Sequence, residues 1–286
     1  MRDIKKILTS SKNTSNIQQR KGKSFGYQVL GFGSGGSVSY TEATGGTITE
    51  DGDFKVHTFT GPGTFEITKL GPEGTVDYMI AAGGGGSGYG YGSSGGAGGY
   101  RASGYGPAPL QASSTPVAVT TYPMVVGAGG AGRPGVPYTS GDQGSVSSGF
   151  SLTAAGGGWG RGGSPSNQGG TGGPGGSGGG ASGGISSIAG VAGGIGNVPV
   201  VDPVQGHNGS PSMNPSSYYM QGGGALAAGG NPSATPNGAP NTISGSDVTY
   251  AGSGPNASTS ANTGMGGKAE GGSATSGIVI IRYQFQ

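Results

Sequence analysis

Glycine runs that follow directly after short apolar segments constrain this sequence more than any other feature. VDYMIAAGGGGSG at residues 76–88, YPMVVGAGGAG at 122–132 and GFSLTAAGGGWG at 149–160 all show the pattern. Glycine loses more backbone entropy on ordering than any other residue, so such runs form poor α-helices and poor isolated strands. Here they continue strand-like segments and recur, which is not the behaviour of linkers between domains. A fold built on them must pack backbone against backbone.

The composition and the placement of apolar residues together indicate whether the chain is ordered or disordered. The chain has 72 glycines and 18 prolines in 286 residues, a level that on its own is typical of disordered sequences. Charged residues make up only 9%, whereas disordered chains are usually rich in charge. The apolar residues also gather in short runs instead of being scattered. The sequence therefore predicts an ordered chain.

The first orderly stretch, residues 45–71, predicts three strands. TIT, FKVHTF and TFEIT are separated by EDGD and GPG, which are turn sequences. Alternation places Val56 on one face of the middle strand and His57 and Phe59 on the other. We expect a meander with one face packed on a core. Later strand-like runs follow in VDYMIAA, YPMVV, GFSLTAA, GGALAAGG, SDVTYAG and SGIVIIRYQF.

The glycine runs themselves favour a left-handed extended helix with three residues per turn and no internal hydrogen bonds. Without Cβ atoms, such helices approach closely, and their N–H and C=O groups pair between neighbours. GGTGGPGGSGGGASGG at residues 169–184 suits this arrangement, and its broken register excludes collagen. The predicted fold class is all-β, with short strands combined with stacked polyglycine II-type helices and little or no α-helix.

The N-terminus is strongly basic. Residues 1–23 contain seven basic residues and one acidic residue, a net charge of +6, and the other 263 residues carry a net charge of −4. Such a tail is either a solvated terminus or a docking segment for an acidic protein or nucleic acid. Nucleic acid is the weaker partner because few aromatic residues lie nearby. We predict a segment at 1–40 and a glycine-rich domain at 41–286. The docking candidates are Lys5, Lys6, Lys12, Arg20, Lys21 and Lys23.

Residues for catalysis or metal binding are sparse. The sequence has no cysteine, and its two histidines, His57 and His207, lack a second ligand at metal spacing. Glycine motifs of the dinucleotide-binding type do not lead into a helix. We therefore expect no enzyme activity, no cofactor and no metal. No apolar run reaches the roughly 18 residues of a membrane span, so we also expect no membrane insertion.

Aromatic residues are the remaining candidates for recognition. They fall in residues 87–121 and 160–221, the longest stretches between strand-like runs, which we expect to form loops at the ends of the stack. Tyrosines there either cap glycine edges or form a binding surface, for which they supply wide contact area at low entropy cost. The candidates are Tyr89, Tyr91, Tyr100, Tyr105, Trp159, Tyr218 and Tyr219.

The ordered series of motifs resembles the glycine-rich domain of bacteriophage tail-fibre and virion surface proteins. The resemblance rests on TGGTITEDGDFKVHTFTGPGTFEIT, VDYMIAAGGGG, YPMVVGAGGAG, LTAAGGG, VTYAGSG and SGIVIIRY, and covers residues 40–286. It implies a virion protein, often a receptor-binding one, with stacked polyglycine helices and variable loops at the tip. The glycine blocks of this chain are interrupted by PVVDPVQGHNGS and NPSATPNGAPN, unlike a regular stack.

Three functions follow as hypotheses. The first is a host-recognition adhesin or short tail fibre, expected as a homotrimer, which binds host polysaccharide or an outer-membrane protein and docks on other virion proteins through its N-terminal segment. The second is a structural decoration protein of the capsid or tail. The third is a depolymerase of host polysaccharide, which requires a pair of carboxylates in a groove and is disfavoured by the thin spread of acidic residues.

Overall fold

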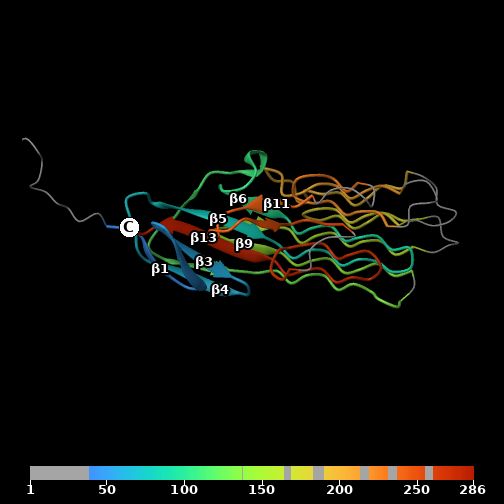
Figure 1. Ribbon diagram of the computed structural model, residues 1–286, viewed down its shortest axis with the longest axis horizontal. Coiled ribbons are helices and arrows are strands. Elements are labelled where there is room, and N and C mark those ends of the chain that lie inside the picture. The colour runs from blue at the N-terminus through green and yellow to red at the C-terminus, as the bar shows by residue number, and fades with distance from the viewer. Residues whose placement is uncertain are drawn as a thin grey trace, which may run out of the picture. The chain divides into compact units, whose positions relative to one another are not determined.

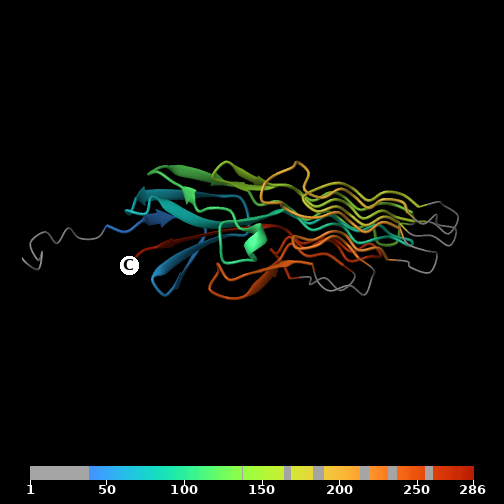
Figure 2. The ribbon, with the colours of Figure 1, turned by 90° about the horizontal axis from the view of Figure 1, so that it is seen from above.

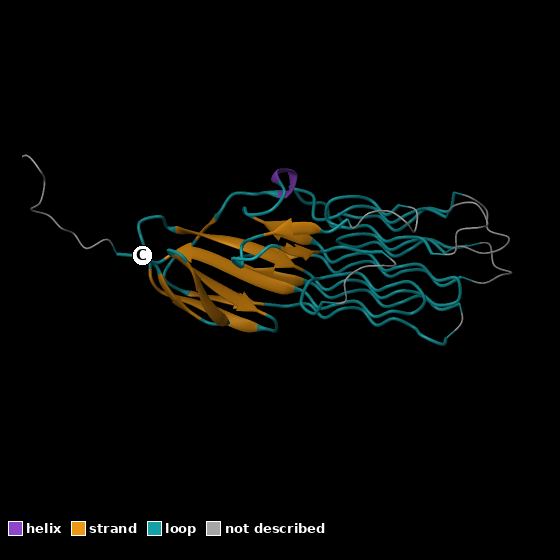
Figure 3. Cartoon of the chain, in the orientation of Figure 1, coloured by secondary structure: helices purple, strands orange, loops and turns teal. Residues whose placement is uncertain are grey.

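The computed structural model describes residues 39–136, 138–163, 169–182, 190–212, 219–230, 237–254 and 260–286. Residues Tyr40–Gln286 form one compact unit. In this unit the strands gather at the end that carries the C-terminus, and extended segments run side by side away from them (Figures 1 and 3). The boundary between an N-terminal segment 1–40 and a domain 41–286 stays a prediction, because the first 38 residues lie outside the described ones.

The largest sheet has the C-terminal strand near its middle. Its strand order is β2-β3-β13-β5-β6, and β13 is antiparallel to both neighbours. Val279 of β13 lies opposite Phe59 on one side and Ile80 on the other. A short strand, β7 (Thr115–Pro116), also pairs with β5. The five strands of the main order are β2 (Thr47–Asp51), β3 (Phe54–Phe59), β13 (Ile278–Gln284), β5 (Thr75–Ala81) and β6 (Tyr100–Ala102).

The other strands form a three-stranded sheet and two hairpins. The three-stranded sheet has the order β1-β4-β8, and the hairpins are β9–β10 and β11–β12, all antiparallel. Their bounds are β1 (Glu42–Thr44), β4 (Gly63–Lys69), β8 (Thr121–Met124), β9 (Ser147–Gly149), β10 (Leu152–Ala154), β11 (Ala239–Asn241) and β12 (Val248–Tyr250).

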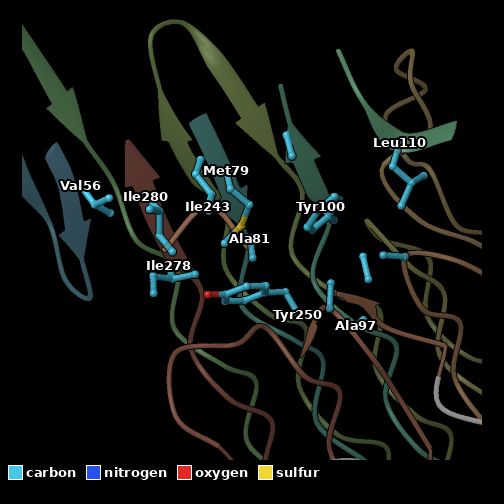
Figure 4. Close-up of a cluster of buried hydrophobic side chains, with 14 residues drawn as sticks. Val56, Met79, Ala81, Ala97, Tyr100, Leu110, Ile243, Tyr250, Ile278 and Ile280 are labelled. Atoms are coloured by element: carbon cyan, nitrogen blue, oxygen red, sulfur yellow. The ribbon is translucent and has the colours of Figure 1, made fainter. Parts of the chain in front are cut away.

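Both faces of the large sheet are buried at β13, whereas the edge strand β2 is exposed. Ile278 and Ile280 of β13 belong to one hydrophobic cluster, shown in Figure 4, and Val279 and Ile281 belong to a second. Residues that alternate along a strand point to opposite faces of the sheet, so β13 contributes to both cores. This explains its continuous apolar run, IVII, which is typical of a strand covered on both sides.

The predicted meander over residues 45–71 is wrong in its pairing. β2 does pair with β3, but β4 pairs with β1 and β8, and the second neighbour of β3 is β13. The expectation of one packed face is also wrong, because Val56 lies in one core and Phe59 in the other. Local turn sequences identify strands, but the C-terminal strand, more than 200 residues away, displaces the neighbour expected from sequence order.

The extended segments beyond the strands form what we call the glycine bundle. Its described residues lie within 82–99, 126–136, 138–146, 155–163, 169–182, 190–212, 219–230 and 264–277. Figure 2 shows these segments running nearly parallel to one another. Many of their glycines are buried.

Backbone hydrogen bonds hold the glycine bundle together with a period of three residues. The N–H groups of Gly83 and Gly86 donate to Ser145 and Asp142, at 3.1 and 2.8 Å. The intervening donors alternate between two other neighbours: Gly84 and Ser87 reach Thr275 and Gly272, and Gly85 and Gly88 reach Gly96 and Ser93. Three residues per turn is the period of the extended helix expected from the sequence. The polyglycine II description itself stays a prediction.

Glycine is required in the bundle because a side chain would clash with the neighbouring backbone. A Cβ on Gly85 would lie 2.1 Å from the carbonyl oxygen of Gly158, and one on Gly83 would lie 2.0 Å from that of Ala128. Real Cβ atoms do not approach backbone oxygens so closely. The glycine runs are thus the residues that let neighbouring backbones reach hydrogen-bonding distance.

The all-β class is confirmed. The described residues contain no α-helix and one short 3₁₀ helix, η1 (Ala108–Leu110). The strand expected in GGALAAGG at 223–230 is wrong, because this stretch belongs to the glycine bundle; the N–H of Gly223, for example, donates to Gly178 O. The expectation that 87–121 and 160–221 are end loops is also wrong, since much of both stretches forms bundle segments and the first also holds β6, η1 and β7.

Candidate functional site

The chain reverses direction at the end of the glycine bundle that is farthest from the strands, which we call the distal end. Segment 82–88 leaves β5 and segment 93–99 returns to β6, so the turn at 89–92 lies there (Figure 1). In the same way, residues 133–140 join a segment that leaves β8 to one that returns to β9. Large side chains stand at these turns: Tyr89 and Tyr91 at the first, and Tyr138 at the second.

A hollow of about 380 Å³ opens at the distal end. Its lining residues are Tyr89, Gly90, Tyr91, Tyr219 and Glu270. They come from three separate parts of the chain: the turn after segment 82–88, the start of segment 219–230 and the reversal between residues 267 and 272. The hollow lies within the size range of small-molecule sites, about 300–1,000 Å³.

The backbone around the hollow is fixed by hydrogen bonds to several neighbours. Tyr89 N donates to Thr139 O at 3.1 Å, and Tyr89 O accepts from Tyr138 N at 3.2 Å. Gly90 O accepts from Gly163 N at 2.9 Å. Gly90 and Tyr91 both have positive φ, 70° and 58°, the combination that a tight type I′ turn requires. The turn that carries Tyr89 and Tyr91 is therefore held in one conformation.

Glu270 is positioned by the same turn. Its Oε1 accepts a hydrogen bond from Gly92 N at 3.2 Å, and Gly271 N donates to Gly88 O at 2.9 Å. The carboxylate thus bridges the two reversals that form the hollow. Among the described lining residues, Glu270 is the one with a charged side chain.

The structure brings together three of the predicted aromatic residues, Tyr89, Tyr91 and Tyr219. Trp159 does not line this hollow; a Cβ on Gly173 would lie 2.3 Å from its indole ring. The indole therefore covers a glycine edge, which is the capping role considered for these residues.

The structure corrects the prediction made for Tyr100. It is 1% exposed in β6 and lies inside the cluster of Figure 4, where its hydroxyl accepts a hydrogen bond from Asn241 Nδ2 at 2.6 Å. Burial raises the pKa of Tyr100 to about 12. The prediction that it stands in an exposed loop is wrong, because a return strand begins at this residue and turns its ring into the core.

Tyr105 lies beside the strands and not at the distal end. It packs against the same buried cluster, and the guanidinium of Arg282 lies 5.0 Å from its ring centroid. Tyr218 and the six basic residues Lys5, Lys6, Lys12, Arg20, Lys21 and Lys23 lie outside the described residues.

Sequence reasoning missed two residues of this region. Glu270 is one of 12 acidic residues in the chain and lies between two glycine pairs in GGKAEGG. An acidic residue within a glycine run is a signal that could have identified it as a candidate. Tyr138 is 55% exposed, and its backbone N–H is bonded to Tyr89. The sequence RPGVPYTSG around Tyr138 is a turn sequence between two glycine segments.

The buried histidine is structural. His57 is 0% exposed, with Nδ1 2.7 Å from Gly45 O and Nε2 3.0 Å from the Tyr283 hydroxyl. A carbonyl can only accept, so Nδ1 carries the proton and Nε2 accepts from Tyr283. Burial lowers the pKa of His57, although the bond to Gly45 opposes this. The neutral imidazole of His57 therefore links β3 to β13 through Tyr283 and to the turn before β2 through Gly45.

Within the described part of the chain, no group of three histidine, aspartate or glutamate side chains is placed to hold a metal ion. Across the same residues, no helix has the length and apolar character needed to cross a membrane.

Comparison with known proteins identifies a family. No curated protein matches the sequence. Residues 58–284 match the model of a family described as a glycine-rich domain. That stretch runs from β3 to the end of β13 and so includes most of the large sheet and the whole glycine bundle. The chain belongs to this family of glycine-rich domains.

Proposed function

We propose that the chain is a surface protein of a bacteriophage particle that attaches the particle to its host through the distal end of the glycine bundle. The observation that carries this proposal is that hydrophobic cores and exposed aromatic residues lie in different regions of the unit Tyr40–Gln286. The two hydrophobic cores are built mainly on the strands, while the distal end carries exposed or half-buried aromatic side chains on fixed turns. The proposed location on a bacteriophage particle is supported by the resemblance of the ordered glycine motifs to virion proteins.

The glycine bundle suits a display role. Its segments are held by backbone hydrogen bonds in several directions, so the bundle can carry its turns without needing a hydrophobic core of its own. Tyrosine surrounded by glycine and serine is the composition of binding surfaces that combine rigid contact area with adaptable hydrogen bonds. In this proposal the basic segment 1–23 docks the protein on an acidic partner in the particle, and host polysaccharide or an outer-membrane protein is the target.

An epitope tag inserted after Gly135 tests the proposal on intact phage. Gly135 has φ of 74° in an exposed turn, and a Cβ there would meet nothing within 4 Å. We expect gold-labelled antibody to mark the tail tip or fibre ends, and the purified chain to reduce adsorption of phage to host cells. A second phage whose protein lacks residues 1–23 should lose the label.

The outcomes separate the alternatives. Label spread over the capsid, with no competition for adsorption, would support the decoration role instead. Particles without any label would contradict the virion assignment. Label at the tail without competition would show a structural tail protein and contradict host attachment.

A further inference from the structure

We propose that the hollow at the distal end binds a protonated amino sugar, with the ammonium group against Glu270 and the sugar ring against the tyrosines. This inference rests on the proposed attachment function and names the chemistry of its target. It is argued from the lining residues Tyr89, Gly90, Tyr91, Tyr219 and Glu270 and from the bonds that hold them.

The lining favours a ligand with one flat side and one positive group. Aromatic rings have a negative face and a positive edge, so tyrosine faces attract both C–H surfaces and cations. Three of the five lining residues are tyrosines, and a fourth, Gly90, has no side chain. A pyranose ring offers a C–H face for such contacts, and an ammonium substituent gains cation–π attraction at the same place.

The carboxylate adds a directed charge. Glu270 Oε1 accepts from Gly92 N at 3.2 Å, which fixes the carboxylate at the mouth of the turn that carries Tyr91. Hydrogen bonds between a carboxylate and an ammonium group are shorter and stronger than bonds between neutral groups. The basic side chain closest to Glu270 in sequence, Lys268, does not line the hollow, and the guanidinium of Arg161 lies against Gly170.

These charges distinguish between classes of sugar. An acidic sugar would place its carboxylate near Glu270 and be repelled, while a neutral sugar would gain only ring contacts and neutral hydrogen bonds. The hydrogen-bonded turns present this surface before a ligand arrives, which reduces the entropy cost of binding. The preference is therefore amino sugar over N-acetylated sugar over acidic sugar.

Binding of matched oligosaccharides to the purified full chain tests this preference. The probes are a glucosamine trisaccharide, its fully N-acetylated form and a galacturonic acid trisaccharide, measured by titration calorimetry at pH 6 and low salt. We expect the glucosamine form to bind at least about tenfold more tightly than the acetylated form. We expect no measurable binding of the acidic form.

The variants separate charge from shape. Glu270→Gln keeps an oxygen that can accept from Gly92 N but removes the charge, so it should reduce the preference for the amino form to the part that cation–π attraction supplies. Tyr219→Ala should weaken binding of both the amino and the acetylated forms. Glu66→Gln, which changes an exposed carboxylate on β4, is the matched control and should bind as the wild type does. Unchanged thermal unfolding shows that each variant is folded.

Some results overturn the pocket but leave the attachment function standing. Equal binding of the amino and acetylated forms, tighter binding of the acidic form, or no effect of Glu270→Gln would each reject the amino-sugar assignment. Normal adsorption of phage that carries Glu270→Gln would also reject the amino-sugar assignment. Competition by the purified wild-type chain would still test host attachment independently. Loss of adsorption in that phage, with the predicted sugar preference, supports the inference.

Discussion

At the scale of single residues, two buried polar side chains, Arg282 and His57, bond to partners that lie far away in the sequence. Arg282 of β13 is 7% exposed; its Nη1 donates to Asp51 Oδ2 at 2.7 Å, and its guanidinium stacks 4.4 Å from the Phe54 ring centroid. His57 is held in the same manner by Gly45 and Tyr283. Such groups join strands that are distant in sequence, so their loss is felt across the sheet.

His57 makes the stability of the fold depend on pH. Its pKa is lowered by burial in the folded state, while an unfolded histidine titrates near about 6.5. As pH falls below that value the unfolded chain takes up a proton that the folded chain resists, so the free energy of unfolding decreases as pH falls from 7 toward 5. Urea denaturation at several pH values measures this slope.

The variant His57→Gln checks the assignment. It should lower the free energy of unfolding at pH 7 by about 1–2 kcal/mol through weakened hydrogen bonds and remove most of the slope between pH 7 and 5. His207→Gln, which replaces the other histidine of the chain, is the matched control and should keep the slope. A slope that survives in the His57 variant would assign the pH dependence to another group.

At the scale of elements, the glycine bundle replaces side-chain packing with backbone packing. Apart from glycine, many interior positions hold alanine or serine, such as Ser94, Ala97 and Ser177, which are all 0% exposed. Amide side chains complete the bonding where the pattern is interrupted; Gln205 Oε1 accepts from Ala155 N at 2.8 Å, and its Nε2 donates to Pro199 O at 2.7 Å. The interruption PVVDPVQGHNGS is thus built into the bundle.

Gly85→Ala tests the steric basis of this element. The new Cβ would meet Gly158 O at 2.1 Å, and the nearest atoms are all backbone atoms of Gly157 and Gly158, so no flexible side chain can move away. We expect the free energy of unfolding to fall by roughly 2–4 kcal/mol. Gly61→Ala is the control, because a Cβ there meets nothing within 4 Å, and it should change stability by less than about 1 kcal/mol. Equal effects of the two variants would contradict the close packing.

At the scale of the whole unit Tyr40–Gln286, strands and glycine bundle share one framework. β5 continues into segment 82–88 and β6 receives segment 93–99, while β13 receives segment 272–277. A bundle segment therefore cannot leave its place without pulling on a strand of the large sheet. We expect the two regions to unfold together.

Hydrogen exchange measures this coupling. Amides of the glycine bundle, such as Gly85 N and Gly96 N, donate at 2.9 and 2.8 Å to neighbouring segments, and they should exchange as slowly as amides of β5 and β13, through global unfolding. Amides in the exposed turn at Gly61 should exchange rapidly and serve as the internal control. Fast exchange in the glycine bundle alongside protected strands would show two separate cooperative units.

The sequence by itself determined the local character of this protein. Turn residues and β-branched or aromatic runs located β3, β4, β5, β8, β12 and β13, and the recurring glycines indicated close backbone packing, because both signals act over a few residues. The sequence also named Tyr89 and Tyr91 as candidates for recognition, and the structure places both at the turn that lines the hollow.

The tertiary structure decided which segments meet. It set β13 between β3 and β5 and placed Glu270 beside a turn almost 180 residues earlier in the chain. It also turned Tyr100 inward and not outward. Glycine segments differ little from one another in local sequence, so their neighbours are chosen by the register of all backbone hydrogen bonds together. That choice is a property of the assembled chain, and no local pattern encodes it.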